Sequence, residues 1–307
     1  MRQAVLATLA YYDVLDFPLT AEEVFQYLVR LPDHTIAREE LTLSETQKTL
    51  DQLLLEKVVG REGEYYFLDE REHLVPFRLK KAKISARKLR HARRISWWLR
   101  FFPHIEAIFA SGSLGLGNCD ELSDLDVLVV AKHGRIWLAR FFITVWLSCW
   151  SLRRQPWHKL APDKICLNHY ITDQSLAIPF HNLYNAQTYI HFQPLLVRDQ
   201  RIVSRFYEAN PWLGDYLYHG APQSYDIMIY HKNWLAGFFE WLLNNPCGAW
   251  LERQTRQYQI KRIEQNPLTR HPTGHVIYDD DQLSFHPASP ETAVMQKYQA
   301  RLTQAGF

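Results

Sequence analysis

The sequence predicts an α+β fold in which a small mixed β-sheet is surrounded by helices and lies between two helical regions. Apolar runs at 105–110 and 125–130 have the length of buried strands, whereas the chain before and after them has apolar residues at helical spacing. A single hydrophobic core rarely grows beyond about 300 residues, so a chain of 307 residues should contain more than one domain. We therefore divide the chain into residues 1–72, 73–104, 105–180 and 181–307.

The composition is typical of a globular protein. Hydrophobic residues make up 47% and charged residues 22%, which is enough apolar material for a core and gives no indication of disorder. The formal net charge of +2 gives no reason to expect binding to nucleic acid or to a membrane. The four cysteines are widely spaced without a CxxC or Cys/His pattern, which argues against a zinc site or a disulfide framework.

The first residues of the sequence and the lack of a disulfide pattern among its cysteines indicate where in the cell the protein is located. The first residues, MRQAVLATLAYYDVLDF, lack the basic region, apolar core and cleavage site of a signal peptide. We therefore expect a cytoplasmic protein. Nothing in the sequence indicates its oligomeric state.

Capping patterns predict two helices within the first 60 residues. Thr20 followed three residues later by Glu23 is a capping box, which predicts a helix over 21–31. Ser44 followed by Gln47 repeats the pattern and predicts the next helix. Both helices should pack through their apolar faces.

A third helix and a hairpin complete this region. Apolar spacing predicts a helix over 4–15, and the runs 58–59 and 65–68 around the turn GREG predict a β-hairpin. Three helices followed by a hairpin resemble a winged helix-turn-helix module covering 1–72, which implies DNA binding, or packing and partner docking. The expected recognition helix, SETQKTLDQLLLEK, carries three acids and two lysines, so nucleic acid is not a favoured partner.

The strongest charge run lies at residues 78–94, RLKKAKISARKLRHARR, which contains nine Lys and Arg and no acid. The run has no Gly or Pro and is rich in helix-forming residues, so it should be helical. Two interpretations stay open: a solvated linker helix, or a basic wall beside an anionic substrate such as a nucleoside triphosphate or a polynucleotide. In either case we expect surface positions for Lys80, Lys81, Arg87 and Lys88.

Two aspartates follow a glycine-rich stretch in the segment GSLGLGNCDELSDLD, residues 112–126. Side chains alternate along a strand, so Asp124 and Asp126 should face the same side of the strand that begins there. Close carboxylates repel unless a cation lies between them, and Mg²⁺ prefers carboxylate and phosphate oxygens as ligands. The pair therefore predicts a Mg²⁺ site.

The glycine-rich stretch suits a phosphate ligand. Gly112 and Ser113 follow a predicted strand, where backbone N–H groups and a hydroxyl could hold a phosphate tail. This stretch resembles the DNA polymerase beta-like nucleotidyltransferase superfamily in its pattern: Gly-Ser, then ten residues, then Asp-hydrophobic-Asp-hydrophobic. Ser123 lies directly before the first aspartate, as in many members. The resemblance covers residues 105–175 and implies that the two aspartates are the catalytic Mg²⁺ ligands. It also implies that Gly112 and Ser113 contact the β- and γ-phosphates of a nucleoside triphosphate, with ATP the expected one.

The sequence departs from the superfamily pattern at the third carboxylate, which usually comes from a later strand. The candidate strand is 164–171, whose polar face carries Cys166 and Asn168 and no acid. Asp163 and Asp173 flank this strand and could reach the site only if its register were shifted; otherwise Asn168 occupies the position of a base. Some members of the superfamily manage with two carboxylates, so metal binding is retained, but a pseudoenzyme is also an interpretation.

The remaining apolar segments predict helices. Residues 136–152, IWLARFFITVWLSCWSL, form a 17-residue run with one internal arginine, whereas a membrane span needs about 20 apolar residues. We expect a buried or half-buried helix and no membrane contact. Apolar residues over 234–243 and basic residues over 253–262, separated by Asn245-Pro246, predict a mostly helical domain over 181–307.

Two functions of different classes follow from these patterns. The first is a Mg²⁺-dependent nucleotidyltransferase that moves a nucleoside monophosphate, with AMP from ATP as the expected group, to an unidentified acceptor and releases pyrophosphate. The second is a DNA-binding regulator with a degenerate, nucleotide-sensing transferase domain. The acidic recognition helix argues against the second, and the intact Gly-Ser and Asp-x-Asp patterns favour the first.

Overall fold

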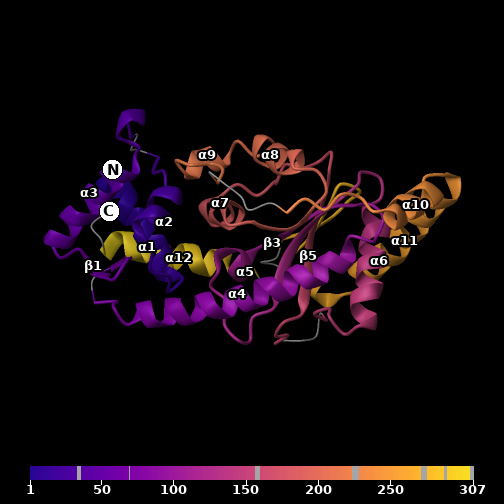
Figure 1. Ribbon diagram of the computed structural model, residues 1–307, viewed down its shortest axis with the longest axis horizontal. Coiled ribbons are helices and arrows are strands. Elements are labelled where there is room, and N and C mark those ends of the chain that lie inside the picture. The colour runs from indigo at the N-terminus through magenta and orange to yellow at the C-terminus, as the bar shows by residue number, and fades with distance from the viewer. Residues whose placement is uncertain are drawn as a thin grey trace.

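A six-stranded mixed sheet forms the centre of the molecule in the computed structural model (Figure 1). The structure describes all residues except 33–35, 69, 156–159, 223–227, 271–274, 287–288 and 305–307. Helices pack on both faces of the sheet, which gives two hydrophobic clusters, one on each side. The predicted α+β class with a mixed sheet is confirmed.

The first 70 residues contain helices and a hairpin in the predicted order. The elements are α1 (Arg2–Val14), α2 (Ala21–Gln26), a short 3₁₀ helix (Arg38–Glu40), α3 (Leu43–Leu55), β1 (Val59–Glu62) and β2 (Tyr65–Leu68). β1 and β2 pair antiparallel, as expected for a hairpin.

Two details of this region differ from the prediction. The capping box of Thr20 and Glu23 is present, but α2 ends at Gln26 instead of 31. The chain leaves the helix because the Val29 N–H donates to the Thr8 hydroxyl at 2.9 Å instead of to a helical carbonyl. The N-cap of α3 is Thr42 and not Ser44, since the Thr42 hydroxyl accepts from the Glu45 N–H at 3.2 Å.

The middle of the chain supplies three strands of the central sheet and the helices around them. These are α4 (Leu74–Leu99), β3 (Ile105–Ala110), α5 (Gly112–Leu116), β4 (Leu125–Ala131), α6 (Ile136–Cys149) and β5 (Ile165–Thr172). All three strands lie where the apolar runs predicted them. Such runs are typical of strands covered on both faces, which is how these strands are packed.

The C-terminal region is helical, as predicted, and also contributes strands. Its elements are α7 (Leu183–Ile190), β6 (Gln193–Val197), α8 (Arg201–Glu208), α9 (Leu213–Tyr216), α10 (Trp234–Leu243), α11 (Pro246–Glu264), a 3₁₀ helix (Pro267–Arg270), β7 (His275–Tyr278), β8 (Gln282–His286) and α12 (Glu291–Gln304). β6, β7 and β8 join the same sheet as β3, β4 and β5. The residues after 180 therefore complete the central sheet.

The strand order in the central sheet is β6-β3-β4-β5-β8-β7. β4 and β5 pair in parallel and every other neighbouring pair is antiparallel. The parallel register places Asp126 opposite Cys166. The beginnings of β4 and β5 thus lie side by side.

Helices α4, α6 and α11 pack on one face of the sheet, while α7 and α8 pack on the other. The C-terminal helix α12 returns to the N-terminal helices and lies against α1, so both ends of the chain are at the same end of the molecule (Figure 1). No helix in the described part of the chain is long and apolar enough to cross a membrane.

Candidate functional site

The two predicted aspartates lie together at the start of β4. Asp124 directly precedes the strand and Asp126 is its second residue. Ligand atoms of Asp124, Asp126 and Cys166 all lie within 4.8 Å of one another. The alternation along β4 and its parallel pairing with β5 produce this cluster, because they bring the Cys166 side chain to the same point as the two carboxylates.

Each of the two aspartates accepts a hydrogen bond from a polar side chain. The Arg154 Nη1 donates to Asp124 Oδ2 at 2.5 Å, and the Asn168 Nδ2 donates to Asp126 Oδ1 at 3.1 Å. The amide oxygen of Asn168 is buried and has no hydrogen-bond partner among the described residues. Asn168 therefore offers a free oxygen beside the two carboxylates.

Burial controls the protonation of the cluster. Desolvation, and next the charge of Asp124, raise the pKa of Asp126 to about 6. Burial and the two carboxylates also raise the pKa of the Cys166 thiol well above its usual range, so Cys166 is a neutral thiol at physiological pH. The cluster thus has two carboxylates as its anionic groups.

Gly112 contacts the aspartate pair in a conformation that favours glycine. Its φ is +56°, and a Cβ at this position would lie 3.0 Å from Asp126 Oδ2. The Ser111 N–H donates to the Asp126 carbonyl at 3.0 Å, which fixes the glycine-rich segment against β4. The Gly112 backbone can therefore approach the carboxylates more closely than any residue with a side chain could.

The two predicted serines lie in different surroundings. Ser113 lines the same cavity as Gly112, and its hydroxyl lies 3.6 Å from the Cys119 thiol. The Ser123 hydroxyl instead accepts from the Asp120 N–H at 3.0 Å and donates to Asp120 Oδ1 at 3.1 Å. Ser123 thus closes the turn before Asp124 and is not one of the described residues that line the cavity.

Neither flanking acid belongs to the cluster. Asp163 accepts from Lys88 Nζ at 2.7 Å, and Asp173 accepts from the His133 N–H at 2.7 Å. The position next to the pair is taken by Asn168, as the expected register of β5 predicted.

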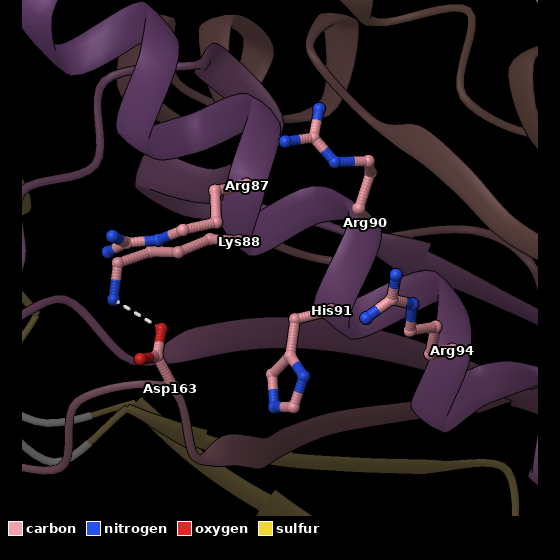
Figure 2. A pocket seen from close by; sticks show the side chains of 6 residues that line it. All are labelled: Arg87, Lys88, Arg90, His91, Arg94 and Asp163. Carbon is pink, nitrogen blue, oxygen red and sulfur yellow. Dashed lines mark hydrogen bonds and ion pairs between the residues drawn. The ribbon is translucent and has the colours of Figure 1, made fainter.

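Lys88 corrects an expectation about the basic helix. It was expected at the surface, but its side chain is 0% exposed and donates to the Glu121 and Ser123 carbonyls and to Asp163 (Figure 2). α4 forms the predicted helix, and Lys88 fastens it to the loop that carries Asp124. Figure 2 shows the other side chains on this side of α4: Arg87, Arg90, His91 and Arg94. Together with Lys88 and Asp163 they line a hollow of about 360 Å³.

Asp126 lines a larger cavity of about 720 Å³, and Asp124 lies beside Asp126 without being one of the described lining residues. Its lining comes from α5, α6, α7, α11 and the neighbouring strands, so it spans segments that are far apart in the sequence. Among the described side chains, four arginines line it: Arg140, Arg153, Arg154 and Arg262. The cavity thus has carboxylates at one place and guanidinium groups around them, which suits a ligand that carries both a cation and anionic groups.

Sequence reasoning did not identify these arginines as site residues. The one signal was Arg140, a charge inside the apolar run that forms α6. Comparison with protein-family models, with curated proteins and with solved structures finds no significant match to this chain.

Proposed function

We propose that this protein is a Mg²⁺-dependent nucleotidyltransferase that moves a nucleoside monophosphate, AMP from ATP, to an unidentified acceptor and releases pyrophosphate. The observation that carries this proposal is that Asp126, which has Asp124 beside it, lines a cavity of about 720 Å³ together with Gly112. A cavity of this size is within the range of small-molecule sites, on the order of 300–1,000 Å³.

The donor set fits Mg²⁺. Asp124 and Asp126 supply carboxylate oxygens, while the amide nitrogen of Asn168 donates to Asp126 Oδ1 and orients that carboxylate. Mg²⁺ prefers oxygen ligands, and one or two carboxylates together with substrate phosphates are its usual protein environment. Mg²⁺ bound by these oxygens would supply positive charge to the acceptor oxygen and to the departing pyrophosphate.

The chain's own residues would position the reactants. Gly112 and Ser113 both line the cavity, where a backbone N–H and the Ser113 hydroxyl would contact a phosphate tail. Arg154 holds Asp124 in place through its 2.5 Å hydrogen bond. Because in-line phosphoryl transfer needs little covalent work from the protein, positioning and charge would provide most of the rate enhancement.

One observation favours the alternative, a DNA-binding regulator with a degenerate, nucleotide-sensing transferase domain. The third carboxylate of the superfamily pattern is replaced by Asn168, which cannot accept a proton as a base. In that case residues 1–72 would act as a winged helix module that binds DNA. The two functions differ in chemistry, because only the transferase releases pyrophosphate.

Titration of Mg²⁺-ATP by isothermal calorimetry, with and without Mg²⁺, tests the metal assignment. Asp124→Asn and Asp126→Asn should each weaken Mg²⁺-dependent binding at least tenfold, because each removes a charged ligand. Without metal the melting temperature of Asp126→Asn should hold or rise, since this variant removes a buried charge that Asp124 repels, whereas Asp124→Asn also loses its ion pair with Arg154. The control is Asp199→Asn, which removes an exposed carboxylate that pairs with Arg201 and does not line the cavity.

The reaction is tested separately, by incubating the protein with cell extract and radiolabelled ATP, GTP, CTP or UTP. A labelled product with pyrophosphate release that disappears in both aspartate variants would support transfer. Equal affinity of the parent and both variants for Mg²⁺-ATP would show that the metal assignment is wrong. Binding without any product, together with salt-dependent binding of duplex DNA, would favour the regulator.

A further inference from the structure

Three arginines meet on one wall of the cavity. Arg140 comes from α6, Arg153 from the segment between α6 and β5, and Arg262 from α11. Each of the three is close enough to the other two for their charges to repel, and this repulsion lowers the pKa values of Arg140 and Arg153 in addition to the larger effect of burial. The fold therefore places two half-buried arginines, Arg140 and Arg153, near an exposed one, Arg262.

The described residues supply no carboxylate to this group. Arg140 Nη1 donates to Gln259 Oε1 at 2.5 Å, and Arg262 Nη1 donates to the Tyr258 hydroxyl at 3.3 Å, so both have neutral partners. Arg154, the next residue along from Arg153, is the arginine that pairs with Asp124. Uncompensated cations in a half-buried site cost stability unless an anion joins them.

Other polar atoms around the group are also without partners. Arg140 Nε, the Thr144 hydroxyl and the Tyr170 hydroxyl are buried and make no hydrogen bond within the described part of the chain. Buried polar groups are nearly always satisfied in native proteins. Thr144 lines the cavity with the arginines, so a polar ligand there could satisfy donors of both kinds.

We infer that Arg140, Arg153 and Arg262 form an anion site that binds a phosphate group. Guanidinium groups match the geometry of phosphate oxygens through paired N–H donors, and a doubly charged phosphate offsets several positive charges better than a single carboxylate does. The Arg140 guanidinium lies over the Phe285 ring, with its central carbon 4.9 Å from the ring centroid, and this contact orients its donors.

This site is separate from the aspartate pair and does not depend on the proposed transfer reaction. Its phosphate could belong to the nucleotide or to the acceptor, because both would enter the same cavity. A phosphate-bearing acceptor would place its anionic group on the arginines while its reacting oxygen lies toward Asp124 and Asp126.

Calorimetric titration of inorganic phosphate into the Mg²⁺-free protein tests the inference directly. Arg153→Gln and Arg262→Gln should each weaken phosphate binding roughly tenfold or more, because a charge-assisted hydrogen bond is lost. The matched control is Arg253→Gln, which removes an exposed arginine from the same helix as Arg262 without touching the cavity lining. It should bind phosphate like the parent.

The aspartate variants separate this inference from the proposed function. Asp124→Asn should retain phosphate binding or tighten it, since it removes a negative charge from the cavity. A parent protein that does not bind phosphate, or arginine variants that bind it as tightly as the parent and Arg253→Gln do, would overturn the site.

A second arm identifies the source of the phosphate. The titration is repeated with the parent protein saturated by Mg²⁺-ATP. Phosphate binding that persists assigns the site to the acceptor, and phosphate binding that is lost assigns it to the nucleotide's own phosphates. Either result supports an arginine site for phosphate.

Discussion

Gly112 has a strained backbone conformation and contacts the charged side chain of Asp126, near the start of β4. Gly112 has a positive φ and leaves no room for a Cβ beside Asp126, while Gly117, at the end of α5, has a φ of +80° with no atom within 4 Å of a Cβ. The two glycines therefore share the conformational requirement and differ in what surrounds them. This difference separates the effect of strain from the effect on the site.

Substitution of these two glycines tests the arrangement. Gly112→Ala and Gly117→Ala should each lower the free energy of unfolding by roughly 1–2 kcal/mol, because a left-handed conformation is costly for alanine. Gly112→Ala should also weaken Mg²⁺-ATP binding at least tenfold, since its methyl group would displace the Asp126 carboxylate. Urea denaturation and calorimetry measure the two quantities, and equal losses of affinity in both variants would contradict the proposed contact.

At the scale of elements, helices are held to one another by long-range caps. α6 has no side-chain cap of its own, and its first-turn N–H groups at Trp137 and Leu138 donate to Glu252 of α11 at 3.0 and 2.9 Å. Lys88 makes a different long-range contact: from the middle of α4 its ammonium donates to the Glu121 and Ser123 carbonyls and joins the helix to the loop before β4. Such contacts fix the orientation of helices whose own sequences supply no cap.

The Glu252 cap predicts a pH dependence of stability. Burial raises the pKa of Glu252 to about 7 from its usual 4.5, so the folded state holds this proton more tightly than the unfolded state. The corresponding stabilisation is present below about pH 4.5 and is lost as the pH rises through about 7, up to about 3 kcal/mol in total.

Comparison of Glu252→Gln with the parent isolates this effect. The variant cannot ionise at this position, so its stability relative to the parent should increase between pH 4 and pH 8. Urea denaturation at each pH measures the difference. Glu264→Gln, at an exposed position of the same helix, is the control and should follow the parent. A constant difference between Glu252→Gln and the parent across this range would argue against a raised pKa.

At the scale of the whole molecule, the N-terminal helices share a core with the rest of the chain. One hydrophobic cluster contains residues of α1, α2 and α3 together with residues of α7, α8, α12 and one face of the sheet. Tyr298 of α12 packs against Tyr11 of α1 with ring centroids 5.6 Å apart. Residues 1–72 are therefore expected to unfold together with the sheet.

Truncation of Tyr298 tests this coupling. Tyr298→Ala removes a side chain in a residue that is 2% exposed, and should lower the free energy of unfolding by roughly 3–5 kcal/mol. Circular dichroism and tryptophan fluorescence should report a single shifted transition in urea. Tyr258→Ala, at a residue that is 54% exposed, should change stability much less. Two separate transitions in the Tyr298 variant would show that residues 1–72 fold as an independent unit.

The sequence alone determined those features that depend on neighbouring residues. Alternation along a strand placed Asp124 and Asp126 on one side and marked β5, while apolar runs marked β3 and β4. The capping box of Thr20 marked the start of α2. Each of these depends on hydrogen bonds and side-chain directions that repeat within a few positions. The polar position of Asn168 could be predicted for the same reason.

Only the tertiary structure decided which distant side chains meet. Arg154 reaches Asp124 across 30 positions and Lys88 reaches Asp163 across 75, and no local pattern encodes either contact. β6, β7 and β8 look like short segments of a helical region until the edges of the sheet pair with them. The grouping of arginines in the cavity lining arises in the same way, because the packing of distant segments brings together like charges that would otherwise repel one another.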